Sequence, residues 1–339
     1  MNNSRDRYLT HLNIFNKNIE KSLKDHFKNN LISPGQALHS NDGRTPFFQL
    51  QGLARIDSKI GKDISKAERL LLDFKEIEDA LGKYDYWVSM LDNNKKWKFP
   101  VVIENYFTNQ SYYQLGILED RLLNEGWLIK ENNEFKYSEH AFERIKKSIK
   151  KVDFYGTEKE QKKLLQFFRD EVIEIHDKVK SNQIDLGDLE MGVHEFRRKI
   201  RWIGIYCSAL MGKVRIEQGK KDEPLFQFVT KERSSLKFNQ LPFNKNQEDP
   251  LYFLQGGYYA ISDLIKGIGD IKDPGLATKE MLQVGKLFGL NDSVIKKHLG
   301  KDYYPYNKVV KDSKDLVHKF LFNENILLLV AQHFDQQIN

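Results

Sequence analysis

Residues 157–175 read TEKEQKKLLQFFRDEVIEI, and this stretch decides the class of the fold. Thr157 and Glu160 have the spacing of a capping box, in which two side chains satisfy the first free amides of a helix. From Leu164 onward the apolar residues recur every three or four positions, which is the period of one buried helix face. The same period occurs in the series Leu70, Phe74, Ile77 and Leu81. Strand-type alternation is scarce, so the sequence predicts a mainly all-α protein.

The composition is that of a folded chain with a mildly basic surface. Among the 339 residues 40% are apolar and 30% are charged, which excludes fibrous, collagenous and wholly disordered proteins. The net charge of +6 indicates a local anion-binding surface rather than a chain that coats nucleic acid. The single cysteine, Cys207, cannot form an intramolecular disulfide, which favours a reducing compartment.

The sequence also lacks the usual signals for export or membrane insertion. The longest strongly apolar run, Ile326 to Ala331, is far shorter than the roughly 20 residues of a membrane span. Residues 1–10 (MNNSRDRYLT) have no apolar core of the secretory type. We therefore expect a cytoplasmic protein with no membrane partner.

Two stretches interrupt the helical pattern. Trp127 to Tyr137 (WLIKENNEFKY) places a polar Asn-Asn pair between apolar flanks, which predicts a small β-hairpin. Residues 219–249 are polar and contain two prolines, so we expect an insertion here. We expect short strands near Phe226 to Val229 and a new helix that starts at Asp249-Pro250.

The chain further contains two imperfectly similar halves. Each half has a basic helix and, further on, a helix end centred on a glycine with Asp and Lys nearby. We predict two pseudo-symmetric helical-bundle halves, preceded by an N-terminal helical extension. The predicted segments are the extension at 1–44, the first helical half at 45–180, and the second helical half at 181–339, which carries the insertion and the C-terminal helices.

The clearest group of charged residues is the segment HEFRRKIR at 194–201. On an ideal helix, with His194 at zero, Arg197 falls near −60°, Arg198 near +40° and Arg201 near −20°, so that the four share an arc of about 100°. The opposite side is apolar and carries Phe196, Ile200, Ile203, Cys207 and Leu210.

Three arginines on one helix face predict an anionic partner. Like charges three or four residues apart repel by about 0.2–0.5 kcal/mol per pair, so this face loses stability unless something negative meets it. Arginine forks suit phosphate oxygens, to which they donate two parallel hydrogen bonds. The alternative is a solvated basic face that pairs with acidic residues of a neighbouring helix.

A weaker version of the pattern lies in the first half. In GLARIDSKIGK at 52–62, the cations Arg55, Lys59 and Lys62 fall within about 60° of one another on a helix. Alone, this helix would be read as an ordinary surface charge stripe. Its significance comes from its match to the second half.

These motifs resemble the conserved-histidine α-helical domain (CHAD) family. In that family each half opens with His-x-x-Arg-x-x-x-(Arg/Lys) and later carries Leu-Gly-x-x-(Arg/Lys)-Asp. The second half matches the first element with His194, Arg197 and Arg201, and the second element with Ile268-Gly-Asp-Ile-Lys-Asp273. The first half matches with Arg55, Lys59 and a later Lys62, and with a shortened element, Leu81-Gly-Lys-Tyr-Asp85.

This chain departs from the family pattern at several positions. Gly52 stands where the first histidine should be, and Asp85 comes one residue early. Trp202 and Gly204 replace positions that are typically basic in the family. The resemblance covers roughly residues 45 to 280.

The resemblance implies a function as well as a fold. Such domains look like two packed helical bundles with a basic surface between them, and they bind inorganic polyphosphate as modules rather than as enzymes. It implies a polyanion site, with no cofactor, metal or catalytic residue, formed by His194, Arg197, Arg201, Arg55, Lys59, Lys62 and Lys272, to which the helix-face pattern adds Arg198.

Two other functions stay open at this point. A nucleic-acid-binding helical protein is favoured by the basic helices, the many tyrosines and the hairpin, but no aromatic residue lies on the basic faces for base stacking. A phosphohydrolase or phosphotransferase would need metal-binding carboxylates near the arginines, such as Asp270 or Asp273, and the sequence has no spaced acidic motif. A zinc-protease motif is excluded because Arg198 occupies the position of its second histidine.

Overall fold

The computed structural model describes residues 3–28, 32–245, 247 and 249–338. It is mainly all-α, as predicted, with two small two-stranded sheets among these residues. The chain divides into two compact units, Asn3–Tyr155 (unit 1) and Gly156–Asn339 (unit 2). No helix in the described part of the chain is both long enough and apolar enough to cross a membrane.

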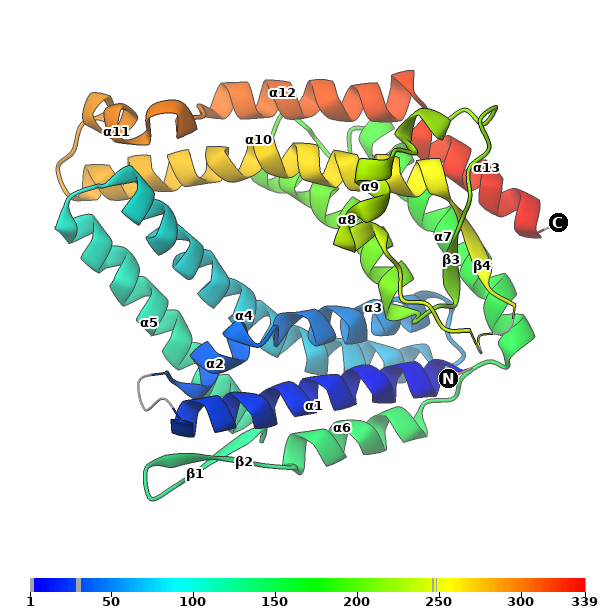
Figure 1. Cartoon of the computed structure of the whole chain (residues 1–339), viewed down its shortest axis with the longest axis horizontal. Coiled ribbons are helices and arrows are strands. Elements are labelled where there is room, and N and C mark those ends of the chain that lie inside the picture. Colours follow the sequence, from blue (N-terminus) through cyan, green and yellow to red (C-terminus); the bar gives the residue numbers. More distant parts are fainter. Residues whose placement is uncertain (1–2, 29–31, 246, 248, 339) are drawn as a thin grey trace. The chain divides into compact units, whose positions relative to one another are not determined.

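Unit 1 is built from consecutive helices and one hairpin (Figure 1). Its elements are α1 (Ser4–Lys28), α2 (Pro34–Ser40), α3 (Arg44–Ile60), α4 (Ile64–Trp97), α5 (Val101–Asn124), β1 (Leu128–Glu131), β2 (Glu134–Tyr137) and α6 (His140–Lys151). Helices α3, α4 and α5 pack in chain order, and α1 packs on α2, α3 and α6. An aromatic cluster fills the core, where the Phe15 ring lies 4.1 Å from that of Phe47 and 4.8 Å from that of Trp127. Because α1 supplies Phe15 to this core, its residues are part of unit 1 rather than a separate extension.

The predicted hairpin is confirmed. Strands β1 and β2 pair antiparallel, with Leu128 opposite Tyr137 and Glu131 opposite Glu134. Asn132 and Asn133 form the two-residue turn with φ of +51° and +64°, the conformation that tight hairpin turns require and asparagine tolerates.

Unit 2 contains the remaining helices and a parallel strand pair. Its elements are α7 (Thr157–Lys180), the π-helical η1 (Leu189–His194), α8 (Glu195–Ala209), β3 (Val214–Glu217), the 3-10 helix η2 (Phe226–Phe228), α9 (Lys231–Ser235), the 3-10 helix η3 (Lys237–Asn239), β4 (Leu251–Leu254), α10 (Gln255–Leu287), α11 (Asp292–Leu299), the 3-10 helix η4 (Gly300–Asp302), α12 (Tyr306–His318), the π-helical η5 (Lys319–Asn323) and α13 (Ile326–Ile338). Helix α10 packs against α8, α11, α12 and α13.

Helix α7 belongs to unit 2, although we expected it in the first helical half at residues 45–180. The physical reason is its packing partner. Its apolar face, which includes Phe168, packs on α13, and the Phe168 ring stacks on Phe334 at 5.6 Å. The contacts therefore divide the chain at 155/156.

The insertion differs from its prediction. Phe226–Phe228 is a 3-10 helix rather than a strand, and the strands lie on either side of the insertion. β3 and β4 pair in parallel, with Val214 opposite Leu251, so the insertion forms the long crossover that a parallel pair requires. Asp249-Pro250 therefore precedes a strand, and the helix begins at Gln255.

Candidate functional site

The basic helix of unit 2 has the two faces that its sequence predicts. The π-helical turn η1 runs directly into α8, and the Asp188 side chain caps the start by accepting hydrogen bonds from the amides of Glu190 (2.8 Å) and Met191 (2.7 Å). The predicted core residues Phe196, Ile200, Ile203, Cys207 and Leu210 are all buried. On the other face His194, Arg198 and Arg201 are exposed and Arg197 is half-buried.

Arg197 lies against a glycine in the middle of α10. Its Nε donates to the carbonyl of Ile265 at 3.2 Å. A Cβ at Gly269 would come within 2.9 Å of Arg197 Nη2, so the missing side chain is what admits the guanidinium. Gly269 was expected at a helix end, but α10 continues through it to Leu287.

Lys272 and Asp273 follow on the next turn of α10. The Lys272 side chain is 5% exposed, and its Nζ lies 2.7 Å from Asp273 Oδ1. Asp273 Oδ2 lies 4.0 Å from Arg197 Nη2. One carboxylate therefore stands beside both cations.

His194 completes this group. Partial desolvation of the imidazole ring lowers the pKa of His194 most, and the charges of Lys272, Arg198 and Arg197 lower it further, while Glu190 opposes the shift. His194 lies at the start of α8, one helical turn before Arg197. We call His194, Arg197, Lys272 and Asp273 the Arg197 cluster.

Part of the basic face is already neutralised within α8. Arg198 Nη2 lies 2.5 Å from Glu195 Oε2, three residues earlier. Lys199 Nζ lies 3.7 Å from Glu195 Oε1 and 4.0 Å from Glu174 on α7. The alternative of a basic face that meets acids of a neighbouring helix therefore applies to Lys199, which lies near Glu174 of α7, and in part to Arg197, which approaches Asp273 of α10 only to 4.0 Å.

The predicted residues of the first half lie in unit 1. Arg55 is half-buried and Lys59 is exposed, both on α3. Lys62 follows α3, and its Nζ lies 2.5 Å from Asp153 Oδ2, a contact that raises the pKa of Lys62. Among the eight predicted residues the structure thus brings together His194, Arg197, Arg198 and Lys272 within unit 2.

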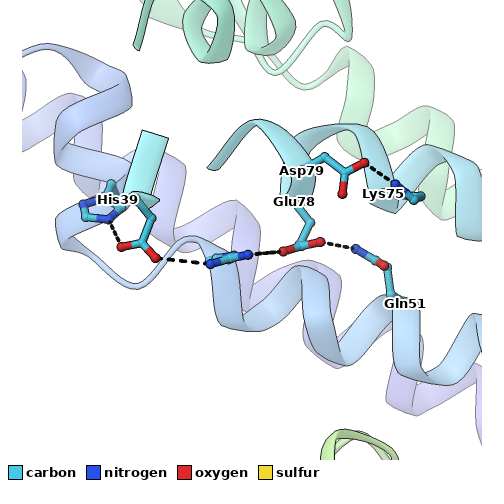
Figure 2. A network of polar contacts seen from close by, with 7 residues as sticks. His39, Gln51, Lys75, Glu78 and Asp79 are labelled. Carbon is cyan, nitrogen blue, oxygen red and sulfur yellow. Dashed lines mark hydrogen bonds and ion pairs between the residues drawn. The ribbon is translucent and has the colours of Figure 1, made fainter. Parts of the chain in front are cut away.

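Sequence reasoning missed Arg44, the first residue of α3. A Cβ at Gly82 of α4 would come within 2.4 Å of Arg44 Nη2, so this arginine also lies against a glycine in mid-helix. Arg44 Nε donates to Glu78 Oε1 at 2.8 Å and Nη1 donates to Asp85 Oδ2 at 3.2 Å. Figure 2 shows the resulting chain of contacts, which runs from His39 through the aspartate and the arginine to Glu78 and then to Gln51.

Each unit therefore contains an arginine over a helix glycine with an aspartate on the following turn. The sequence comparison matched Arg55 to Arg197, whereas this geometry matches Arg44 to Arg197. The number of residues between arginine and glycine could have revealed the match of Arg44 to Arg197. Arg44 precedes Gly82 by 38 residues. Arg197 precedes Gly269 by 72 residues, or by 41 when the 31 residues of the insertion at 219–249 are left out. Arg55 precedes Gly82 by only 27.

The two arrangements differ in charge. Glu78 lies four residues before Gly82, and its carboxylate, which is 9% exposed, contacts Arg44. Ile265 lies four residues before Gly269 and offers Arg197 only its main-chain carbonyl. Arg44 thus meets two carboxylates. In the Arg197 cluster two cations, Arg197 and Lys272, share one carboxylate, so one positive charge is left over.

Comparison of the chain with protein-family models, with curated proteins and with solved structures found no match. The CHAD resemblance therefore stays a prediction that rests on the motifs in the sequence. Within the described residues, no three His, Cys, Asp or Glu side chains are arranged to hold a metal ion.

Proposed function

We propose that unit 2 binds inorganic polyphosphate, or a similar phosphate-rich polyanion, through the Arg197 cluster and the exposed Arg198 and Arg201. The observation that carries this proposal is the unequal charge of the two arginine arrangements. The Arg44 arrangement holds enough carboxylates for its cation, whereas the Arg197 cluster retains an unmatched positive charge. An anion from solution would supply the missing charge.

The position of Arg197 suits this role. Its Nε donates a hydrogen bond to the Ile265 carbonyl, and its guanidinium packs against Gly269. Because the side chain is already positioned, ligand binding costs little side-chain entropy. A guanidinium donates two parallel hydrogen bonds to phosphate oxygens, and the neighbouring ammonium of Lys272 adds a point charge.

The extent of the surface favours a polymer over a single phosphate. From His194 to Arg201 the basic face follows α8 for about 10 Å, at 1.5 Å per residue. Several consecutive phosphates can contact a stripe of this length, and each contact that neutralises a phosphate releases counterions.

The test is retention on immobilised polyphosphate over a series of salt concentrations. Arg197→Ala with Arg201→Ala should abolish most retention, and the slope of log affinity against log salt should become shallower by about 1.4, or roughly 0.7 per lost phosphate contact. The matched control is Lys286→Ala with Lys297→Ala, which also removes two positive charges from unit 2. Lys286 lies about 21 Å from Lys272 along α10, and Lys297 lies on α11. A third variant, Arg55→Gln with Lys59→Gln and Lys62→Gln, tests the predicted residues of unit 1 and should lose less, because Lys62 already has Asp153.

Three outcomes would count against the proposal. Equal losses in the arginine variant and the lysine control would mean that total charge, not this surface, governs retention. A large fall in the unfolding temperature of the arginine variant would make the arginines structural. Competition for the immobilised polyphosphate distinguishes the two ligand classes. Free polyphosphate should release the bound protein at a lower phosphate concentration than single-stranded DNA, RNA or duplex. A preference for one nucleic-acid sequence would instead favour the nucleic-acid function.

A further inference from the structure

Asp273 is the carboxylate of the Arg197 cluster, and its side chain is more exposed than those of the two cations next to it. Its side chain is 58% exposed, whereas that of Lys272 is 5% exposed and that of Arg197 is 23% exposed. Its two oxygens point to the two cations, at 2.7 Å from Lys272 and 4.0 Å from Arg197. Among these three charged groups Asp273 is therefore the most accessible to an anion from solvent.

The contact between Asp273 and Arg197 is incomplete. At 4.0 Å the two groups attract each other, but they are too far apart for a hydrogen bond. In unit 1 the corresponding contact, from Arg44 to Asp85, is a hydrogen bond of 3.2 Å, and Glu78 adds a second at 2.8 Å. Asp273 thus satisfies Lys272 and leaves Arg197 without the carboxylate bonds that Arg44 has.

We infer that Asp273 is an internal counter-anion that a phosphate group displaces when the polyanion binds. The inference rests on the proposed function and adds a residue that sets the affinity of that site. A buried ammonium needs an anionic partner, so Asp273 stabilises Lys272 in the empty site. A phosphate has more oxygens than a carboxylate, and it can contact Lys272 and Arg197 at hydrogen-bond distance together. The exposed Asp273 side chain then turns toward solvent.

Removal of this carboxylate should strengthen binding. Asp273→Asn takes away a competitor for Lys272 and a negative charge beside the bound phosphate, while the amide oxygen still accepts a hydrogen bond from Lys272. Two unit charges 4 Å apart interact, even in bulk water, strongly enough for about a fivefold change in affinity. We expect Asp273→Asn to bind polyphosphate at least about fivefold more tightly than the wild-type protein.

Asp270 provides the matched control. It lies one turn earlier on α10, is 64% exposed, and pairs with Lys266 at 2.7 Å. Asp270→Asn makes the same change in net charge without touching the Arg197 cluster, so it should change affinity less than about twofold, as screened surface charges do. Asp273→Glu keeps the carboxylate and should bind close to wild-type affinity.

The experiment measures the Kd for polyphosphate and the unfolding temperature of the full chain in each variant, with Asp273→Ser as a second neutral replacement. Equal gains in Asp270→Asn and Asp273→Asn would overturn the inference, because net charge would then explain both. Weaker binding in Asp273→Asn, or loss of folding in both neutral variants, would also overturn it and make Asp273 a structural partner of Lys272. The proposed function fails separately, if Arg197→Ala with Arg201→Ala leaves retention unchanged.

Discussion

Substitution of alanine for the glycines that contact Arg44 and Arg197 should affect stability at Gly82 and polyphosphate binding at Gly269. A methyl group at Gly82 would lie 2.4 Å from Arg44 Nη2 and 3.0 Å from its Cζ, so the guanidinium must move as a whole. A methyl group at Gly269 would lie 2.9 Å from Arg197 Nη2 and 3.5 Å from the Cζ and Nε atoms. There only the Nη2 end of the guanidinium must move, while the Nε end can stay near the Ile265 carbonyl.

The expected free energies follow from these contacts. Alanine in a helix interior is favoured over glycine by about 0.5–1 kcal/mol. At Gly82 this gain is opposed by the loss of two hydrogen bonds between charged groups, each contributing about 1.5–3 kcal/mol, one of them to the nearly buried Glu78. We expect Gly82→Ala to destabilise the protein by about 2–5 kcal/mol. At Gly269 the hydrogen bond to the Ile265 carbonyl is donated by Arg197 Nε, which lies 3.5 Å from the added methyl group, so this bond is weakened rather than lost, at a cost of about 1 kcal/mol. This cost roughly offsets the gain in helix propensity, so Gly269→Ala should leave stability unchanged within about 0.5 kcal/mol.

Thermal unfolding and polyphosphate retention of the same variants test this. Gly116→Ala on α5 is the control, because a Cβ there has no neighbour within 4 Å and the full gain in helix propensity should appear. Gly82→Ala should unfold several degrees lower and retain polyphosphate, whereas Gly269→Ala should unfold at the wild-type temperature and bind more weakly. The reasoning is refuted if Gly82→Ala is as stable as Gly116→Ala, or if Gly269→Ala is destabilised as much as Gly82→Ala.

Two further predictions concern single titratable side chains. The pKa of His194 is lowered in the free protein by burial and by Lys272, Arg198 and Arg197, and a bound phosphate should raise it, so binding takes up a proton and affinity should rise as the pH falls from about 7.5 to 5.5. His194→Gln should flatten this dependence in a polyphosphate titration, and equal slopes would place His194 outside the site. Burial raises the pKa of the Cys207 thiol well above its usual range, so iodoacetamide at pH 8 should label Cys207 only after denaturation. Rapid labelling of the native chain would contradict the packing of α8.

The sequence predicted those parts of the fold in which a short segment determines its own structure. The apolar stripe of α8 is buried as expected, and Asn132-Asn133 forms the hairpin turn, because both patterns are local. The strands around the insertion were missed because each has only four residues and its partner lies beyond the insertion. Leu251 and Phe253 alternate with the exposed Tyr252, but three alternating residues cannot be told from part of a helix.

The sequence predicted which residues of α8 share the basic face, but not which residues of other elements lie against that face. His194, Arg197 and Arg198 lie on the helix face that their spacing indicates, since 3.6 residues per turn fixes the face. Which acidic groups meet that face depends on packing, and Glu195 engages Arg198 while Asp273 approaches Arg197 only to 4.0 Å. Lys272 was chosen from the motif resemblance, and its burial beside Asp273 could not be read from the sequence.

The comparison of the two units shows why offsets within one helix misled the matching of the halves. Arg55 and Arg197 share a spacing to later basic residues, but the feature that recurs in three dimensions is an arginine that packs on a glycine of another helix. The residue four positions before that glycine then sets the charge of the arrangement. Glu78 completes the Arg44 network as a closed set of ion pairs, and Ile265 leaves the Arg197 cluster one carboxylate short. A single side chain on α4 or α10 therefore separates an arrangement that stabilises its unit from one that can accept an anion, and this difference is the physical basis for the proposed site in unit 2.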